Sequence, residues 1–138
     1  MSKLEYDMRN FDEVSLFYNE AINFIALNDY GAAIKSIKKN IDRLKNPDDI
    51  ALAYLNCGFL NDKLADYSSA IEDFTESISF EAELEIINQR SKDVSYSGRS
   101  NSRYKNGDYE GAIKDKRKAK NIRLLEMYKS KGLNNIKI

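Results

Sequence analysis

The sequence predicts an all-α protein made of antiparallel helix pairs that stack one after another. Three observations support this prediction. A short signature occurs three times, small and apolar residues recur at helical spacing before each copy, and the 138 residues include only one proline and six glycines. Because helices tolerate proline and glycine least, long helices are allowed almost everywhere, whereas a sheet joined by tight turns is poorly supported.

The signature reads as a small or polar residue, Asp, Tyr, two variable residues, Ala, Ile and a charged residue. Its copies span residues 28–35, 65–72 and 107–114. Each aspartate is expected to cap the N-terminus of a helix, because its carboxylate can accept a hydrogen bond from a free backbone N–H of the first turn. The tyrosine then begins the helix, the alanine permits close approach of a neighbouring helix, and the isoleucine faces the core.

A second helix is expected before each signature. It carries an aromatic residue followed four positions later by a small one. These pairs are Phe17 and Ala21, Tyr54 and Gly58, and Tyr96 and Ser100. A small residue at this position lets two antiparallel helices cross with their backbones close together.

The middle copy belongs to a longer motif. It contains Tyr54-x-x-Cys57-Gly58 and, after the signature aspartate and tyrosine, Ala70-x-x-x-Phe74. This pattern resembles the tetratricopeptide repeat, whose helix pairs carry aromatic-x-x-Leu-Gly-x-x-Tyr and Ala-x-x-x-Phe. The resemblance implies a right-handed superhelical stack of antiparallel helix pairs, an α-solenoid of about six helices that forms a single domain over residues 1–138.

By this resemblance the repeats span residues 14–47, 51–84 and 93–126. Repeat one places Ala33 and Ile37 at the alanine and phenylalanine positions of the motif, whereas repeat three has Lys116 where phenylalanine is usual. A final repeat often departs from the pattern, since its outer face meets solvent. Residues 127–138 are expected to form the end of the last helix and a tail.

The repeats are unevenly spaced, with 37 residues from Phe17 to Tyr54 and 42 from Tyr54 to Tyr96. Both spacings exceed the period of the family. The extra residues of the first spacing are assigned to a loop, after which Asn46 caps a helix that has proline in its first turn. Those of the second spacing form an insertion over residues 85–92, about two helical turns or roughly 12 Å long, which lengthens either the helix before it or the helix after it. Helices are therefore expected over residues 11–27, 30–45, 48–63, 67–81, 83–105 and 109–131.

The sequence shows no constellation of catalytic residues. Histidine, the commonest general base and metal ligand, is absent from the chain. The single cysteine, Cys57, takes a core-facing position of the repeat, where an inert buried thiol is expected rather than a nucleophile. We therefore expect a protein that is not an enzyme and needs no cofactor or metal.

The charges sum to zero but are unevenly placed. Residues 48–85 hold ten acidic residues and one lysine, and residues 111–138 hold nine basic and two acidic residues. These runs are either solvated helix faces or two poles that steer a charged partner or a second copy of the chain. The balanced total argues against nucleic-acid binding. Because neither a signal peptide nor an apolar membrane span is visible, a cytoplasmic location without membrane contact is expected.

The resemblance also implies a concave binding surface lined by the first helix of each repeat. The groove positions are Tyr18, Asn19, Ile22, Leu55, Asn56, Phe59, Asn101, Tyr104 and Lys105. Asn19 and Asn56 are equivalent in successive repeats, and an asparagine side chain can both donate to and accept from a peptide backbone. Alternatively, the asparagines are only solvated or bond within the stack, and the apolar members of the set pack inward.

These observations predict a protein-interaction module, either a scaffold or a chaperone-like adaptor, that binds a peptide or helix of another protein in its groove. Two alternatives stay open. The opposed charges would also suit a structural module that assembles into homo-oligomers, and chaperones of bacterial secretion systems use three similar repeats. The identity of the partner is not encoded in any motif of the chain.

Overall fold

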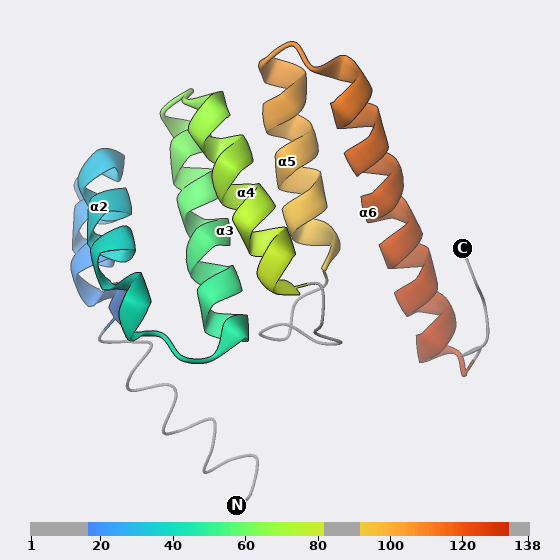
Figure 1. Cartoon of the computed structure of the whole chain (residues 1–138), viewed down its shortest axis with the longest axis horizontal. Coiled ribbons are helices and arrows are strands. Elements are labelled where there is room, and N and C mark those ends of the chain that lie inside the picture. The colour runs from blue at the N-terminus through green and yellow to red at the C-terminus, as the bar shows by residue number, and fades with distance from the viewer. Residues whose placement is uncertain (1–16, 82–91, 133–138) are drawn as a thin grey trace, which may run out of the picture.

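The computed structural model describes residues 17–81 and 92–132, and every regular element within these ranges is a helix (Figure 1). The elements are a helical segment over residues 17–26, α2 (Tyr30–Asn40), the short 3-10 helix η1 (Ile41–Arg43), α3 (Pro47–Lys63), α4 (Tyr67–Glu81), α5 (Asp93–Lys105) and α6 (Tyr109–Ser130). The predicted all-α class is therefore confirmed for the described part of the chain.

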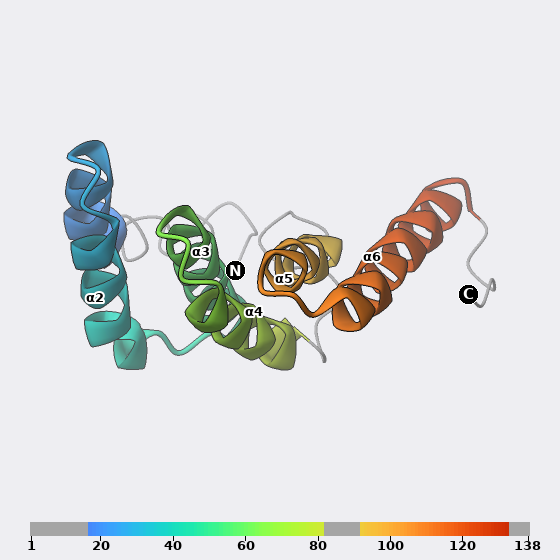
Figure 2. The same cartoon turned by 90° about the horizontal axis from the view of Figure 1, so that it is seen from above.

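The helices follow one another in space in the order in which they occur in the sequence. Consecutive helices run in opposite directions, so the chain forms helical hairpins that stand side by side (Figures 1 and 2). Helix α3 contacts α2, α4 and α5, and α5 contacts α4 and α6. The three signatures lie at the turns of the three hairpins, all at the same end of the stack.

The N-caps predicted from the signatures are present. The carboxylates accept hydrogen bonds from backbone N–H groups three residues later, at 3.1 Å for Asp29, 3.2 Å for Asp66 and 2.9 Å for Asp108. Asn46 caps α3 by accepting from a backbone N–H two residues later, and Pro47 is the first residue of that helix, as expected.

The residue before each of these signature aspartates adopts a left-handed backbone conformation. The φ angles are 58° at Asn28, 59° at Ala65 and 88° at Gly107. Glycine takes this conformation freely and asparagine tolerates it, but an alanine there costs about 1–2 kcal/mol because its Cβ approaches the following carbonyl oxygen. The turn of the middle hairpin is therefore strained in a way that the other two are not.

One expected helix ends differently from the observed one, and the start of another lies outside the described residues. The helix expected over residues 30–45 ends as an α-helix at Asn40 and tightens into η1, whose last turn is closed by the backbone bond from Leu44 N–H to Ile41 O. The helix expected over 83–105 is seen from Asp93 onward. The insertion expected at 85–92 lies outside the described residues, except for Lys92.

Two hydrophobic clusters hold the stack together. The first joins the first two hairpins and contains Ala21, Ala33, Ile37, Ala53, Cys57 and Leu60; the second contains Leu55, Ala70 and Phe74. The second cluster depends on two glycines. A Cβ atom added to Gly58 would lie 2.7 Å from the ring of Phe74, and one added to Gly98 would lie 2.6 Å from it. The Phe74 ring is therefore held between the bare backbones of α3 and α5.

Buried carboxylates add a second kind of contact, which recurs at equivalent positions of repeats two and three. Asp73 accepts a 2.8 Å hydrogen bond from Asn61 Nδ2 and forms a 2.8 Å ion pair with Lys38 of α2. Burial alone would lower the pKa of Lys38, but the hydrogen bond and charge of Asp73 outweigh this effect and raise it. A buried carboxylate that lost these partners would be strongly destabilising.

The corresponding carboxylate of repeat three is Asp115. Arg99 holds both of its oxygens, with N–O distances of 2.9 and 2.8 Å, and Arg103 Nη1 adds a contact at 2.7 Å. Arg99 also donates to Thr75 Oγ1 at 3.2 Å, which ties this cluster to α4 of the preceding repeat. Helices α5 and α6 are thus fixed to each other by charge-assisted bonds rather than by a large apolar cluster.

Cys57 is fully buried in the first cluster, where burial raises the pKa of its thiol to about 12. The neutral thiol is therefore the species present near neutral pH. Within residues 17–81 and 92–132, no helix is long and apolar enough to cross a membrane. The same residues contain no cluster of three or more cysteine, aspartate, glutamate or histidine side chains placed to hold a metal ion.

Candidate partner-binding groove

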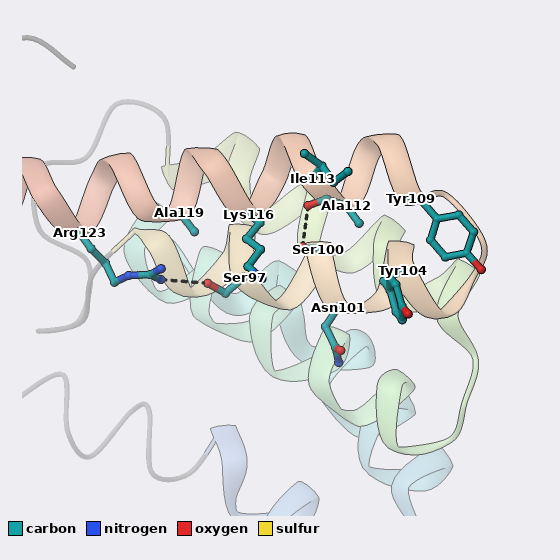
Figure 3. A pocket seen from close by; sticks show the side chains of 10 residues that line it. All are labelled: Ser97, Ser100, Asn101, Tyr104, Tyr109, Ala112, Ile113, Lys116, Ala119 and Arg123. Atoms are coloured by element: carbon teal, nitrogen blue, oxygen red, sulfur yellow. Dashed lines mark hydrogen bonds between the residues drawn. The ribbon is translucent and has the colours of Figure 1, made fainter.

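An open pocket of about 490 Å³ lies along the last hairpin, between α5 and α6 (Figure 3). We call it the α5–α6 groove. It is lined by Ser97, Ser100, Asn101 and Tyr104, and, from the turn onward, by Tyr109, Ala112, Ile113, Lys116, Ala119 and Arg123. Four of these residues come from α5 and six from α6, so the groove belongs to the last hairpin of the described residues.

The floor of the groove is set by the close approach of the two helices. Ser100 Oγ donates a 2.7 Å hydrogen bond to the backbone carbonyl oxygen of Ala112, as Figure 3 shows. Ala112 and Ala119 are buried and present only methyl groups, about one and three turns into α6. The small residue predicted at position 100 and the signature alanine therefore produce a shallow, largely apolar floor.

Aromatic and aliphatic side chains stand at the turn end of the groove. The rings of Tyr104 and Tyr109 meet edge to face, with their centroids 5.2 Å apart, on either side of the turn. Their exposed fractions are 63% and 60%, and that of Ile113 is 52%. Three large side chains are thus left in contact with water at one site, which distinguishes this region from a solvated helix face.

The remaining part of the groove is cationic. Arg123 Nη1 pairs with Asp93 at 2.9 Å and lies 3.5 Å from Ser97 Oγ at the end opposite the tyrosines (Figure 3). Lys116 lies midway along α6, and no ion pair joins it to any other residue of the described ranges. The groove therefore offers a free ammonium group beside apolar surface.

Two residues predicted for the partner-binding surface, Asn101 and Tyr104, line this groove. Lys105, although next to them in sequence, points to the preceding hairpin. Its Nζ lies 3.7 Å from Asp62 Oδ2 and 5.5 Å from the centroid of the Tyr67 ring. It therefore joins repeats two and three rather than lining the α5–α6 groove.

The other predicted positions are divided between core and surface. Leu55 is 3% exposed and packs against Ala70 and Phe74, so it offers almost no surface to a partner. Ile22 and Phe59 are exposed, and the Phe59 ring also meets Phe74 edge to face at 5.0 Å.

Tyr18 lies beside Asn56 on the first two hairpins. Burial raises the pKa of the Tyr18 phenol, and the neighbouring Asn56 side chain lowers it only in part. Asn56 is half-buried and Asn19 is exposed. The two asparagines predicted as equivalent therefore differ in environment, because one faces a tyrosine of the neighbouring helix.

Sequence reasoning missed the contribution of α6. Tyr109, Ile113 and Lys116 belong to the second helix of a repeat, whereas a concave surface of the expected kind uses first helices. A signal was available in Lys116, which stands where the repeat motif has phenylalanine. A cation at that position indicates a surface that meets solvent rather than a packed interior.

No protein-family model matches the chain, and no curated protein matches it either. Membership of the tetratricopeptide family therefore stays a prediction that depends on the repeated motif.

Proposed function

We propose that this chain is a protein-interaction module, a scaffold or chaperone-like adaptor, that holds a helix or peptide of a partner protein in the α5–α6 groove. The proposal is supported above all by one observation: exposed Tyr104, Tyr109 and Ile113 lie together beside an apolar floor. Tyrosine and other large side chains in clefts of this kind dominate the binding energy of protein interfaces. The groove is open along its length, which suits a chain segment better than an enclosed small molecule.

The repeated motif supports a finer assignment. In our proposal the stacked hairpins form a right-handed tetratricopeptide-like superhelix, and the protein acts in the cytoplasm. Asn19, Ile22, Asn56 and Phe59 would then belong to a second, concave part of the binding surface. Catalysis forms no part of the proposal, since the one cysteine is buried with a raised pKa.

Affinity capture from the source cell with matched surface variants tests the proposal. Ile113→Ser removes an exposed apolar side chain from the groove, whereas Lys118→Ser changes an exposed residue of the same helix that does not line it. We expect the first variant to lose the partner recovered with the unchanged chain and the second to retain it.

A third variant locates the site if the groove is the wrong one. Asn56→Ala changes the α3 surface without touching α5 or α6. Loss of the partner with Asn56→Ala alone would move the binding site to the concave surface, and a chain that retains no protein above background would overturn the proposed function.

Self-assembly is the second candidate, supported by the opposite charges of two helices. Exposed Glu72 and Glu76 lie on α4, whereas exposed Lys116, Arg117 and Lys120 lie on α6. Light scattering at low and high salt separates this candidate from the first. Salt-sensitive oligomers would support it, and a monomer at every salt and protein concentration would exclude it.

A further inference from the structure

The α5–α6 groove repeats a surface that is covered elsewhere in the molecule. The signature tyrosines Tyr67 and Tyr109 are 42 residues apart, and each residue that lines the groove has a counterpart 42 positions earlier on α3 or α4. For example, Lys116 corresponds to Phe74, and Arg123 corresponds to Glu81. Helix α5 covers that earlier surface, so its contacts show how a helix sits on a surface of this shape.

Three of the contacts that helix α5 makes with the α3–α4 surface mark its start, middle and end. Near its N-terminus, Ser95 Oγ donates a 2.6 Å hydrogen bond to Glu81 Oε1. In its middle, the bare backbone of Gly98 meets the ring of Phe74. In its last turn, Lys105 Nζ lies 5.5 Å from the centroid of the Tyr67 ring.

The last of these contacts also occurs at the junction of the first two hairpins. Lys63, in the last turn of α3, lies 5.6 Å from the centroid of the Tyr30 ring, the signature tyrosine of the first repeat. A lysine from the following helix therefore covers the signature tyrosine at both internal junctions. Such contacts between an ammonium group and an aromatic ring are attractive, and here each joins the last turn of a helix to the preceding hairpin.

The third signature tyrosine, Tyr109, lacks this contact. Within residues 17–81 and 92–132, no lysine or arginine lies over its ring, and the residue is 60% exposed. The groove therefore resembles an internal junction on which no helix of the described part of the chain packs.

We propose that a single amphipathic helix of a partner protein fills the α5–α6 groove in the orientation that α5 takes on α3 and α4. This inference rests on the proposed function and names the chemistry of the partner. The bound helix carries an acidic residue near its N-terminus, a large apolar side chain in its middle, and a lysine or arginine in its last turn.

Each of these features follows from a difference or an identity between the two surfaces. Arg123 replaces Glu81 and uses Nη1 to pair with Asp93 at 2.9 Å, so an acid suits this guanidinium group better than the serine of α5 does. Lys116 replaces Phe74, so the apolar bulk at the centre must come from the incoming helix, for which the groove leaves about 490 Å³. Tyr109 keeps the identity of Tyr67, so the cation in the last turn is retained.

The spacing of the three features is given by α5 itself. Ser95, Gly98 and Lys105 are three and then seven residues apart, which predicts the order acid, two residues, large apolar residue, six residues, cation. With 3.6 residues per turn, these spacings place all three side chains on one side of the helix.

A second copy of the chain fits this pattern less well. If the copies stacked end to end, the helical segment 17–26 of one copy would occupy the groove of the other. The residue of this segment that corresponds to Lys63 and Lys105 is Ala26, which has no charge to place over the ring of Tyr109. A separate partner is therefore favoured over self-assembly at this site.

A peptide derived from α5 tests the proposal directly. The probe has the sequence of residues 92–106 with the substitutions S95E and G98L, and is held helical by a side-chain staple on its solvent face. The control peptide carries S95K and G98L. Both are labelled and titrated with the full chain, and binding is measured by fluorescence anisotropy at low and high salt.

We expect the S95E probe to bind about tenfold more tightly than the S95K control at low salt, with a smaller difference at high salt. Replacing Lys105 by alanine in the probe should weaken binding about two- to fivefold. In the protein, Arg123→Glu should reverse the preference between the two peptides, and Tyr109→Ser should weaken the binding of both. The control Lys118→Glu should leave the order of the two affinities unchanged. Circular dichroism confirms that each variant is folded.

Equal binding of the two peptides, or binding that ignores both groove variants, overturns the proposed occupant. Failure of every probe to bind also overturns it. The proposed function survives that failure if capture of a cellular partner still depends on Ile113, and it falls separately if no partner is captured at all. The chain could instead form salt-sensitive oligomers in the absence of any probe. If Tyr109→Ser abolished them, the occupant of the groove would be a second copy of the chain and not a partner helix.

Discussion

Phe74 and Lys116 occupy equivalent positions of two successive helix pairs, yet their surroundings differ completely. Phe74 is fully buried between the backbones of α3 and α5, whereas Lys116 lies in a groove open to water. Both follow the same signature by the same number of residues and lie on the same side of their helices. The difference therefore arises from what packs on each site: Gly98 of a third helix covers Phe74, whereas no helix within residues 17–81 and 92–132 covers Lys116.

This comparison shows that the residues that form a helical hairpin are distinct from the contacts that join one hairpin to the next. The caps at Asp66 and Asp108 have nearly the same geometry, with hydrogen bonds of 3.2 and 2.9 Å. The hairpins they begin are therefore built alike. One surface is an interior because α5 packs on it, and the other is an exposed groove because no helix of the described residues packs on it.

The largest effect is expected when the interior site is emptied. Phe74→Ala should lower the free energy of unfolding by about 3–5 kcal/mol, because it removes a buried ring and leaves a cavity between two glycines. Lys116→Ala, at the equivalent position, should change it by less than about 0.5 kcal/mol. Urea denaturation followed by circular dichroism measures both, and similar losses for the two variants would show that the comparison is wrong.

A smaller loss is expected when the interior site is overfilled. Gly98→Ala places a Cβ atom 2.6 Å from the Phe74 ring, so the ring or the helix must shift at a cost of about 1–3 kcal/mol. Gly31→Ala is the control, because its Cβ would meet nothing within 4 Å. That variant should gain about 0.5 kcal/mol from better helix propensity. The same denaturation experiment compares them, and a Gly98→Ala protein as stable as the unchanged one would argue against close contact between α5 and Phe74.

The turn of the middle hairpin offers a gain in stability. Ala65 has a φ of 59°, whereas Gly107 fills the equivalent place in the last hairpin. Ala65→Gly should therefore raise the free energy of unfolding by about 0.5–1 kcal/mol, and Gly107→Ala should lower it by about 1 kcal/mol. Thermal unfolding of the two variants gives the signs. Changes in the same direction would mean that the left-handed turn is not retained.

The elements of the fold could be predicted from the sequence because their signals are local. A cap such as Asp29 acts on a backbone group three residues away, and Pro47 marks the start of α3 by its own geometry. The burial of Asp115 could not be predicted in this way. Its partner Arg99 lies 16 residues earlier on another helix, and only the packed pair explains why a carboxylate is tolerated inside.

The candidate site was predicted only in part for the same reason. Asn101 and Tyr104 were found because they lie on a first helix of the repeat, and they do line the groove. Leu55 was selected by the same rule, but it faces Phe74, since α3 has neighbours on more than one side. Tyr109 and Ile113 were missed because their exposure depends on which helices pack on α6, which is a property of the stack and not of the motif.

The smallest expected change in stability, and the most direct probe of the open surface, is Lys116→Phe. It gives the groove the residue found at the interior site, and the free energy of unfolding should change by less than about 0.5 kcal/mol because the position meets solvent. The added exposed ring should instead promote association through the groove, seen as a mass that rises with protein concentration in light scattering. Lys118→Phe adds the same ring to α6 outside the groove and should stay monomeric. If both variants associate equally, the added ring alone is responsible and the groove has no special tendency to bind a neighbouring helix. Association of Lys116→Phe alone would show that the groove accepts a neighbour.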